Sequence, residues 1–227
     1  MLTPRVPTTL GDIKYNPIAV RIPESLSFDA ATFWPLTISS VQWMHQLDAE
    51  HGDIVVILGQ GLVGSICMQV LKTLRDCSVI AIDTLSLRCN LASTLGADEV
   101  INASKQDALQ HVMALTNGKG ADIVVYTVGG KSGPRAFKQG LEMVKTNGLI
   151  QVIGLYEDKP LPLDSRKIQR RRLIGGHLDT LDRSTSASIA LDLLISNKIQ
   201  TDQMITHRYP YERASDAFAL LYNRLEE

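Results

Sequence analysis

The stretch VVILGQGLVG, residues 55–64, decides the fold of this chain. An apolar run ends at a glycine, and three glycines follow at the spacing G-x-G-x-x-G: Gly59, Gly61 and Gly64. The run predicts a buried strand, and residues 62–74 place their apolar side chains on one face of a helix. Such a loop either holds the pyrophosphate of a dinucleotide at the start of the helix, or is only a tight turn between a strand and a helix.

The alternation of strand and helix continues along the chain. Short apolar runs predict strands at 53–58, 78–83, 98–102, 121–128, 148–154 and 171–177. Helical patterns lie at 62–74, 85–96, 106–118, 133–144, 185–197 and 211–225. Strands that alternate with helices pair in parallel through right-handed crossovers, so the predicted fold class is a doubly wound α/β sheet with helices on both faces.

Residues 25–227 are expected to form one dinucleotide-binding Rossmann domain. Two short helices, at 27–33 with Ser27 as the cap and at 35–47 with Pro35 in the first turn, precede the first strand. Residues 1–24 contain four prolines and are expected to be an extended lead-in.

Bulk composition excludes several classes of protein. The chain has 227 residues, 44% of them hydrophobic, and a net charge of −1, so no general attraction to nucleic acid or acidic membranes is expected. The first residues lack the apolar core of a secretory signal, and no apolar run reaches the roughly 20 residues that span a bilayer. Three cysteines without C-x-x-C spacing argue against a disulfide framework and a structural zinc site, and favour the cytoplasm.

The acid at the end of the second strand completes the dinucleotide fingerprint. Asp83 lies 19 residues after Gly64 (83 − 64), close to the spacing of about 20 that the motif requires. A carboxylate at this position accepts hydrogen bonds from the hydroxyls of the adenosine ribose and repels a 2′-phosphate. The sequence therefore predicts NAD as the cofactor, with NADP disfavoured.

Seven segments follow one another in a characteristic order: VRIPESLSFDAATFWPLTISSVQWM, GDIVVILGQGLVG, VIAID, LGADEVIN, GKGADIVVYTVGG, NGLIQVIG and RRLIGGH. In this order and spacing the chain, from about residue 15 to about residue 225, resembles the cofactor domain of the medium-chain dehydrogenase/reductase superfamily, the zinc alcohol dehydrogenase-like proteins. The resemblance implies the strand order 3-2-1-4-5-6 and NAD(P)-linked hydride transfer between the nicotinamide and an alcohol or carbonyl substrate.

The resemblance also implies which residues meet the cofactor. The loops after strands four, five and six border the nicotinamide, and Arg88 either covers the adenine face or is a solvated helix residue. The expected cofactor contacts are Gly59, Gln60, Gly61, Leu62, Val63, Gly64, Asp83, Arg88, Val128, Gly129, Gly154, Leu155 and Gly176. His177 is a weak catalytic candidate, because a single histidine is more often a structural residue.

Several family features are missing from this sequence. It has no G-H-E motif, it carries Trp34 where polyol dehydrogenase-like members place a zinc-binding glutamate, and it lacks the four-cysteine lobe. We therefore expect no bound zinc and no GroES-like catalytic domain. Phe33, Trp34 and Trp43 are expected on an apolar surface that would face that domain.

Two functions remain open at this point. The first is an oxidoreductase of the alcohol or polyol dehydrogenase type whose catalytic half is absent from this chain. The second is a non-catalytic NAD(H)-binding module that serves as a sensor or subunit. In the family, a short strand between strands five and six pairs across a two-fold axis. KPLPLD, residues 159–164, occupies that place and predicts a homodimer, unless its prolines only cap an edge strand.

Overall fold

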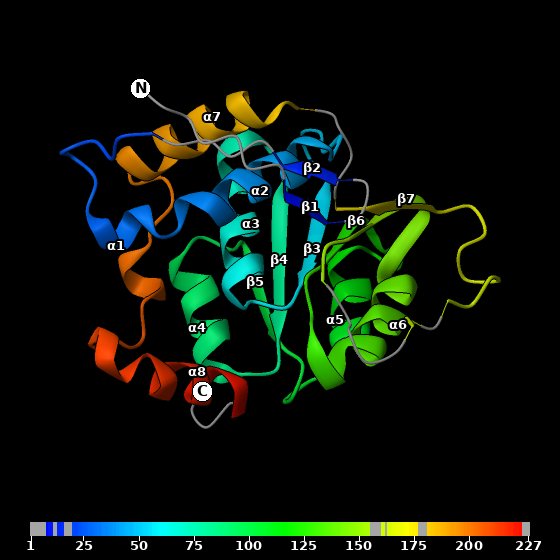
Figure 1. Ribbon diagram of the computed structural model, residues 1–227. Helices are drawn as coiled ribbons and strands as arrows, with labels where there is room; N and C mark the ends of the chain where they lie inside the picture. The colour runs from blue at the N-terminus through cyan, green and yellow to red at the C-terminus, as the bar shows by residue number, and fades with distance from the viewer. Residues whose placement is uncertain are drawn as a thin grey trace.

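The computed structural model describes residues 8–10, 13–15, 20–154, 160–161, 163–176 and 181–223. A six-stranded parallel sheet lies at its centre (Figure 1). Its strands, in spatial order, are β5 (Glu99–Asn102), β4 (Ser78–Asp83), β3 (Ile54–Leu58), β6 (Ala121–Tyr126), β7 (Val144–Val152) and β8 (Arg172–Gly175). Counted from β3, this is the order 3-2-1-4-5-6, so the predicted fold is confirmed.

Alternate residues of each strand pack on opposite faces of the sheet. Val55 and Ile57 belong to the core beneath α2 (Trp34–His45), α3 (Leu62–Leu74), α4 (Ser86–Thr94) and α7 (Arg183–Ile195). Val56 and Leu58 belong to a second core beneath α5 (Ala108–Leu115) and α6 (Gly133–Met143). Both faces of the sheet are therefore covered, as Figure 1 shows for α5 and α6 on one side and α2, α3 and α7 on the other.

Three of the helices, α1, α5 and α7, begin at a capping side chain. Ser27 accepts a hydrogen bond from Ala30 N at the start of α1 (Phe28–Ala31), and Pro35 lies in the first turn of α2. Asp107 and Asp182 cap α5 and α7 in the same way. The remaining elements are α8 (Ala214–Asn223) and the 3₁₀ turns η1 (Gly130–Ser132), η2 (Asp202–Met204) and η3 (Tyr211–Arg213).

Two parts of the backbone differ from the sequence-based expectation. β1 (Thr8–Leu10) and β2 (Ile13–Tyr15) pair antiparallel, a pairing that the sequence did not indicate. β7 begins at Val144 instead of residue 148, because Val144 pairs with Ala121 before a register shift and Leu149 then pairs with Ile123. The shift contains Asn147, whose φ is 65°.

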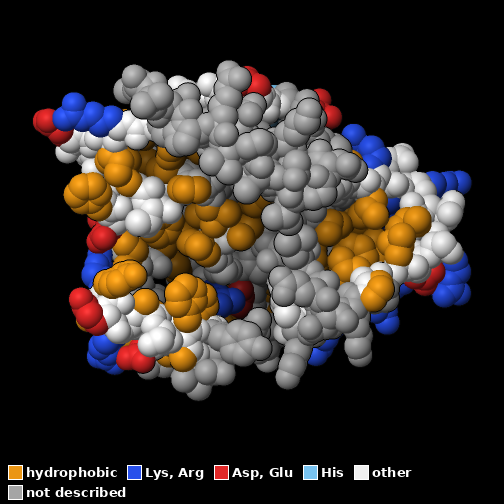
Figure 2. All heavy atoms as spheres, in the orientation of Figure 1, with side chains coloured by type: hydrophobic (Ala, Val, Ile, Leu, Met, Phe, Trp, Pro, Cys, Tyr) orange, Lys and Arg blue, Asp and Glu red, His pale blue; other side chains and the backbone are white. Residues whose placement is uncertain are grey.

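The prediction that Phe33, Trp34 and Trp43 lie on an exposed apolar surface is wrong. Phe33 and Trp43 are buried, and the indole of Trp34 donates to the carbonyl oxygen of Ala187 at 3.0 Å. These side chains of residues 33–43 pack inward because α7 covers α2. Figure 2 shows hydrophobic side chains gathered on the face that carries α1 and α8, where Phe28, Phe218 and Leu221 are 81%, 71% and 76% exposed.

Within the described part of the chain, none of the helices combines the length and the apolar character that crossing a bilayer requires.

Candidate dinucleotide-binding site

Two of the three loop glycines are required by the protein itself. Gly59 has a φ of +90°, a left-handed conformation that strains other residues, and its N–H donates to Ile82 O at 2.8 Å. A Cβ on Gly64 would lie 1.8 Å from Gly59 O. The first turn of α3 thus packs directly against the end of β3, and only a glycine at position 64 permits this approach.

Gly61 is different, because no neighbouring group of the protein requires a glycine at this position. Its φ of −71° suits any residue, and a Cβ there would meet only Arg88 Nη1, at 3.8 Å. Gly61 is also the N-cap of α3, and no side chain caps this helix. The first-turn N–H groups of α3 therefore face the open space beside Gly61, which suits an anion such as a pyrophosphate.

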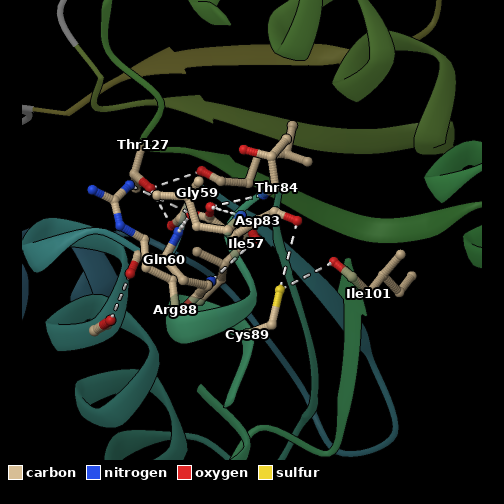
Figure 3. A network of polar contacts seen from close by, with 12 residues as sticks. Ile57, Gly59, Gln60, Asp83, Thr84, Arg88, Cys89, Ile101 and Thr127 are labelled. Atoms are coloured by element: carbon tan, nitrogen blue, oxygen red, sulfur yellow. Dashed lines mark hydrogen bonds and ion pairs between the residues drawn. The ribbon is translucent and has the colours of Figure 1, made fainter. Parts of the chain in front are cut away.

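Asp83 ends β4 directly beside this loop (Figure 3). Its Oδ2 accepts a hydrogen bond from Gln60 N at 2.7 Å, and its Oδ1 accepts from Thr84 N and Leu85 N at 2.7 and 2.9 Å. A carboxylate has about four acceptor positions, so roughly one remains on Oδ2 for a ligand hydroxyl. Asp83 therefore has a role that the sequence did not indicate: it anchors the glycine loop as well as facing the site.

Arg88, on α4, lies between the two parts of the dinucleotide fingerprint, the glycine loop and Asp83. Its Nη1 is 3.7 Å from Asp83 Oδ2, and its side chain is 47% exposed. The guanidinium can therefore reach ligand groups beside Gly61 or beside Asp83. Both interpretations of Arg88 from the sequence, contact with the adenosine and a solvated helix residue, stay open.

The end of β6 lies against the same loop, and the end of β7 lies against the end of β6. A Cβ on Gly59 would come within 3.0 Å of Val128 Cγ2, and one on Gly154 within 2.6 Å of Val128 O. Gly154 N also donates to Tyr126 O at 2.8 Å. Val128, Gly129 and Gly154 are thus placed where strand ends converge, as the predicted nicotinamide border requires.

Gly176 lies against α2, because a Cβ there would be 3.1 Å from Trp43 Nε1 and its carbonyl accepts from Gln46 Nε2 at 2.8 Å. Two other candidates, Leu155 and His177, lie outside the described residues. The roles of all three residues therefore stay predictions.

The cysteines show no sign of metal-binding chemistry. Burial raises the pKa of the Cys67 thiol to about 12 and that of Cys77 to about 11, and it also raises the pKa of Cys89. These thiols are therefore protonated at neutral pH and poor ligands. In the described ranges, no three or more His, Cys, Asp or Glu side chains form a group that could hold a metal. The expected absence of zinc stays a prediction.

One residue of the site was not predicted from the sequence. Thr127 follows β6, and its Oγ1 lies 2.7 Å from Leu58 O and 2.8 Å from Gly59 O (Figure 3). The only signal in the sequence is a hydroxyl residue directly after the fourth strand, in VVYTVGG. Its contact with the glycine loop depends on the pairing of β3 with β6, which lie far apart in the chain.

Residues 63–194, more than half of the chain, match the family model described as zinc-binding dehydrogenase. The chain belongs to this family. Its resemblance to the zinc alcohol dehydrogenase-like superfamily is thereby confirmed.

Relatives of this family share the fold and part of the sequence. L-Threonine 3-dehydrogenase of Bacillus licheniformis is 34% identical over 173 residues, which cover 74% of this chain and 47% of that protein. Sorbitol dehydrogenase of Bacillus subtilis is 27% identical over 201 residues, covering 86% and 54%. An alcohol dehydrogenase structure from Thermus sp. ATN1 superposes with a TM-score of 0.76 at 27% identity, covering 90% of this chain and 58% of that one. The chain thus spans about half the length of the curated relatives it matches.

Proposed function

We propose that this chain binds NAD(H) with its glycine loop and orients the nicotinamide for hydride transfer in an oxidoreductase of the alcohol or polyol dehydrogenase type. The observation that carries the proposal is the open space at Gly61, where a Cβ would meet only Arg88 Nη1, at 3.8 Å. No neighbouring atom requires a glycine there, whereas a pyrophosphate that approaches the start of α3 does.

The preference for NAD over NADP rests on Asp83. Its side chain is 6% exposed, and the acceptor position left on Oδ2 suits a ribose hydroxyl. A 2′-phosphate would bring negative charge against this carboxylate, and the nearby Arg88 already compensates part of the charge of Asp83 itself. NADP(H) is therefore the poorer fit.

The division of roles follows from the site. When bound, the nicotinamide supplies hydride transfer to or from a substrate carbon. The chain's own residues bind and orient: α3 holds the pyrophosphate, Asp83 the adenosine ribose, and the ends of β6 and β7 border the nicotinamide. Relatives named for threonine, sorbitol and D-arabitol phosphate support a small hydroxylated substrate.

The test of the proposed chemistry is alcohol-dependent formation of NADH by the purified 227-residue chain, assayed with threonine, sorbitol and arabitol phosphate. We expect binding of NADH but very little turnover, because polarising the substrate oxygen requires groups beyond the dinucleotide site. Robust turnover that Gly61→Val abolishes would place the catalytic groups within these residues, and His177 would be the first to mutate. Tight NADH binding with no detectable turnover at all, also after addition of zinc, would instead favour the alternative, a module that only binds NAD(H).

Three further statements belong to the proposal. We place the protein in the cytoplasm, in keeping with three buried cysteines that form no disulfide.

We expect the chain to hold no stoichiometric zinc. Elemental analysis of protein purified without added metal tests this expectation. We also propose a homodimer, supported by the open edge of the sheet at β8.

A further inference from the structure

The hydroxyl of Thr127 lies at the point where three elements meet. Thr127 N donates to Leu58 O at 3.0 Å, and its Oγ1 faces both Leu58 O and Gly59 O at hydrogen-bonding distance. The same oxygen would be 2.9 Å from a Cβ on Gly64, in the first turn of α3. The side chain directly after β6 therefore contacts the end of β3 and the glycine loop, and it lies beside the start of α3.

The glycine loop needs such support. Gly59 adopts a left-handed φ of +90°, and glycine loses more conformational freedom on folding than any other residue. From the other side, Asp83 Oδ2 accepts the Gln60 N–H at 2.7 Å. The loop is thus held between two side chains: Asp83 on its N–H side and Thr127 on its carbonyl side.

We infer that Thr127 is a positioning residue for the dinucleotide. Its hydroxyl has one proton, which it donates to Leu58 O or Gly59 O or shares between them, and so it holds the loop and the first N–H groups of α3 ready for the pyrophosphate. A loop that is already ordered loses less entropy when it binds a ligand. The inference rests on the proposed function, because it assigns Thr127 to the dinucleotide site.

The first experiment measures NADH affinity by calorimetric titration. Thr127→Val replaces the hydroxyl with a methyl group of similar size, Thr127→Ala removes both the hydroxyl and the methyl group, and Thr127→Ser keeps the hydroxyl. Thr73→Val is the matched control, because Thr73 Oγ1 makes a similar bond to Gln69 O at 2.9 Å near the other end of α3. We expect NADH to bind about five- to tenfold more weakly to the first two variants, the effect of one lost hydrogen bond, and within about twofold of wild type to the other two.

The second experiment needs no cofactor. Hydrogen exchange of the ligand-free protein should be faster at the Gly59 and Gln60 amides in Thr127→Ala than in wild type, and unchanged there in Thr73→Val. These amides donate to Ile82 O and Asp83 Oδ2, so their exchange reports whether the loop opens.

The two experiments separate the inference from the proposed function. If wild-type protein binds no NADH, the proposed function is wrong, and hydrogen exchange alone decides whether Thr127 holds the loop. If wild type binds NADH and both hydroxyl-free variants bind it equally well, the inference is overturned. Failure of Thr127→Ser to keep the wild-type affinity would also overturn it, because the hydroxyl is the group to which the effect is assigned.

Discussion

At the scale of single residues, the three glycines of one motif have different surroundings. Gly59 supplies a left-handed turn and Gly64 a close contact between helix and strand, whereas a Cβ on Gly61 would meet only Arg88 Nη1, and we propose that a ligand uses this space. The motif G-x-G-x-x-G by itself does not distinguish these three positions. Their substitutions should therefore separate folding from binding.

We predict that Gly64→Ala lowers the free energy of unfolding by about 3 kcal/mol or more, since its Cβ would lie 1.8 Å from a backbone oxygen that cannot move without the strand. Gly61→Ala should change it by no more than about 0.5 kcal/mol, because its φ and its surroundings accept a side chain. Urea unfolding of both variants measures this. Equal losses of stability would show that Gly61, too, is a structural glycine.

Sequence reasoning found the residues of the site whose roles are local. The glycine spacing and the distance to Asp83 are properties of one continuous β-α-β unit, so they could be predicted. The role of Thr127 was not predicted. The resemblance implied that β6 lies beside β3, but no pattern in the sequence indicates that the first side chain after β6 reaches the glycine loop. The inward packing of Trp34 and Trp43 was missed because their partners, Ala187 of α7 for Trp34 and Gly176 for Trp43, lie far along the chain.

At the scale of elements, local signals placed most strands and helices well. Capping side chains such as Ser27 and Asp107 mark helix starts, because they satisfy N–H groups that the helix leaves unpaired. The start of β7 was missed because its first residue joins β6 across a register shift, which no local pattern signals.

Asp122 joins three strands at the opposite end of the sheet. On β6, it accepts a hydrogen bond from Ile54 N of β3 at 2.8 Å and pairs with Lys145 of β7. Partial burial raises the pKa of Asp122, but the bond from Ile54 and the ammonium of Lys145 outweigh it and hold the pKa below its ordinary value of 3.8. A lowered pKa in the folded state means that the ionised carboxylate stabilises the fold.

We predict that Asp122→Asn costs on the order of 1 kcal/mol of unfolding free energy at neutral pH. The stabilisation by the carboxylate is complete above its ordinary pKa and is lost as the pH falls through the lower pKa of the folded state. The difference in unfolding free energy between wild type and Asp122→Asn should therefore decrease as the pH falls below about 4. Urea unfolding at several pH values measures this difference. A gap that stays constant across this range would contradict this account of Asp122.

At the scale of the whole molecule, the sheet has one edge with exposed apolar residues. β8 forms the edge beyond β7, and Leu173 on this strand is 44% exposed. Leu163, in the segment that the sequence singled out for dimer contacts, is 48% exposed. Among the residues that the structure describes, β8 pairs only with β7, and an edge strand of this kind is a template for pairing with another strand.

We predict a homodimer at micromolar concentration, and a monomer when Leu173→Glu places charge on this edge. Light scattering of wild type and variant checks both parts. Wild-type protein that is only monomeric would refute the dimer, and a dimer unaffected by Leu173→Glu would place the interface elsewhere.

The central claim is that the glycine loop and Asp83 together form an NAD(H) site. The most direct test is calorimetric titration of NADH and NADPH into wild type, Gly61→Val and Asp83→Ser. We predict that wild type binds both dinucleotides saturably and binds NADH more tightly than NADPH. A folded Gly61→Val variant should bind neither dinucleotide. In Asp83→Ser the difference between the NADH and NADPH affinities should be smaller than in wild type. No NADH binding by wild type, or equal NADH binding by a folded Gly61→Val, would contradict the claim.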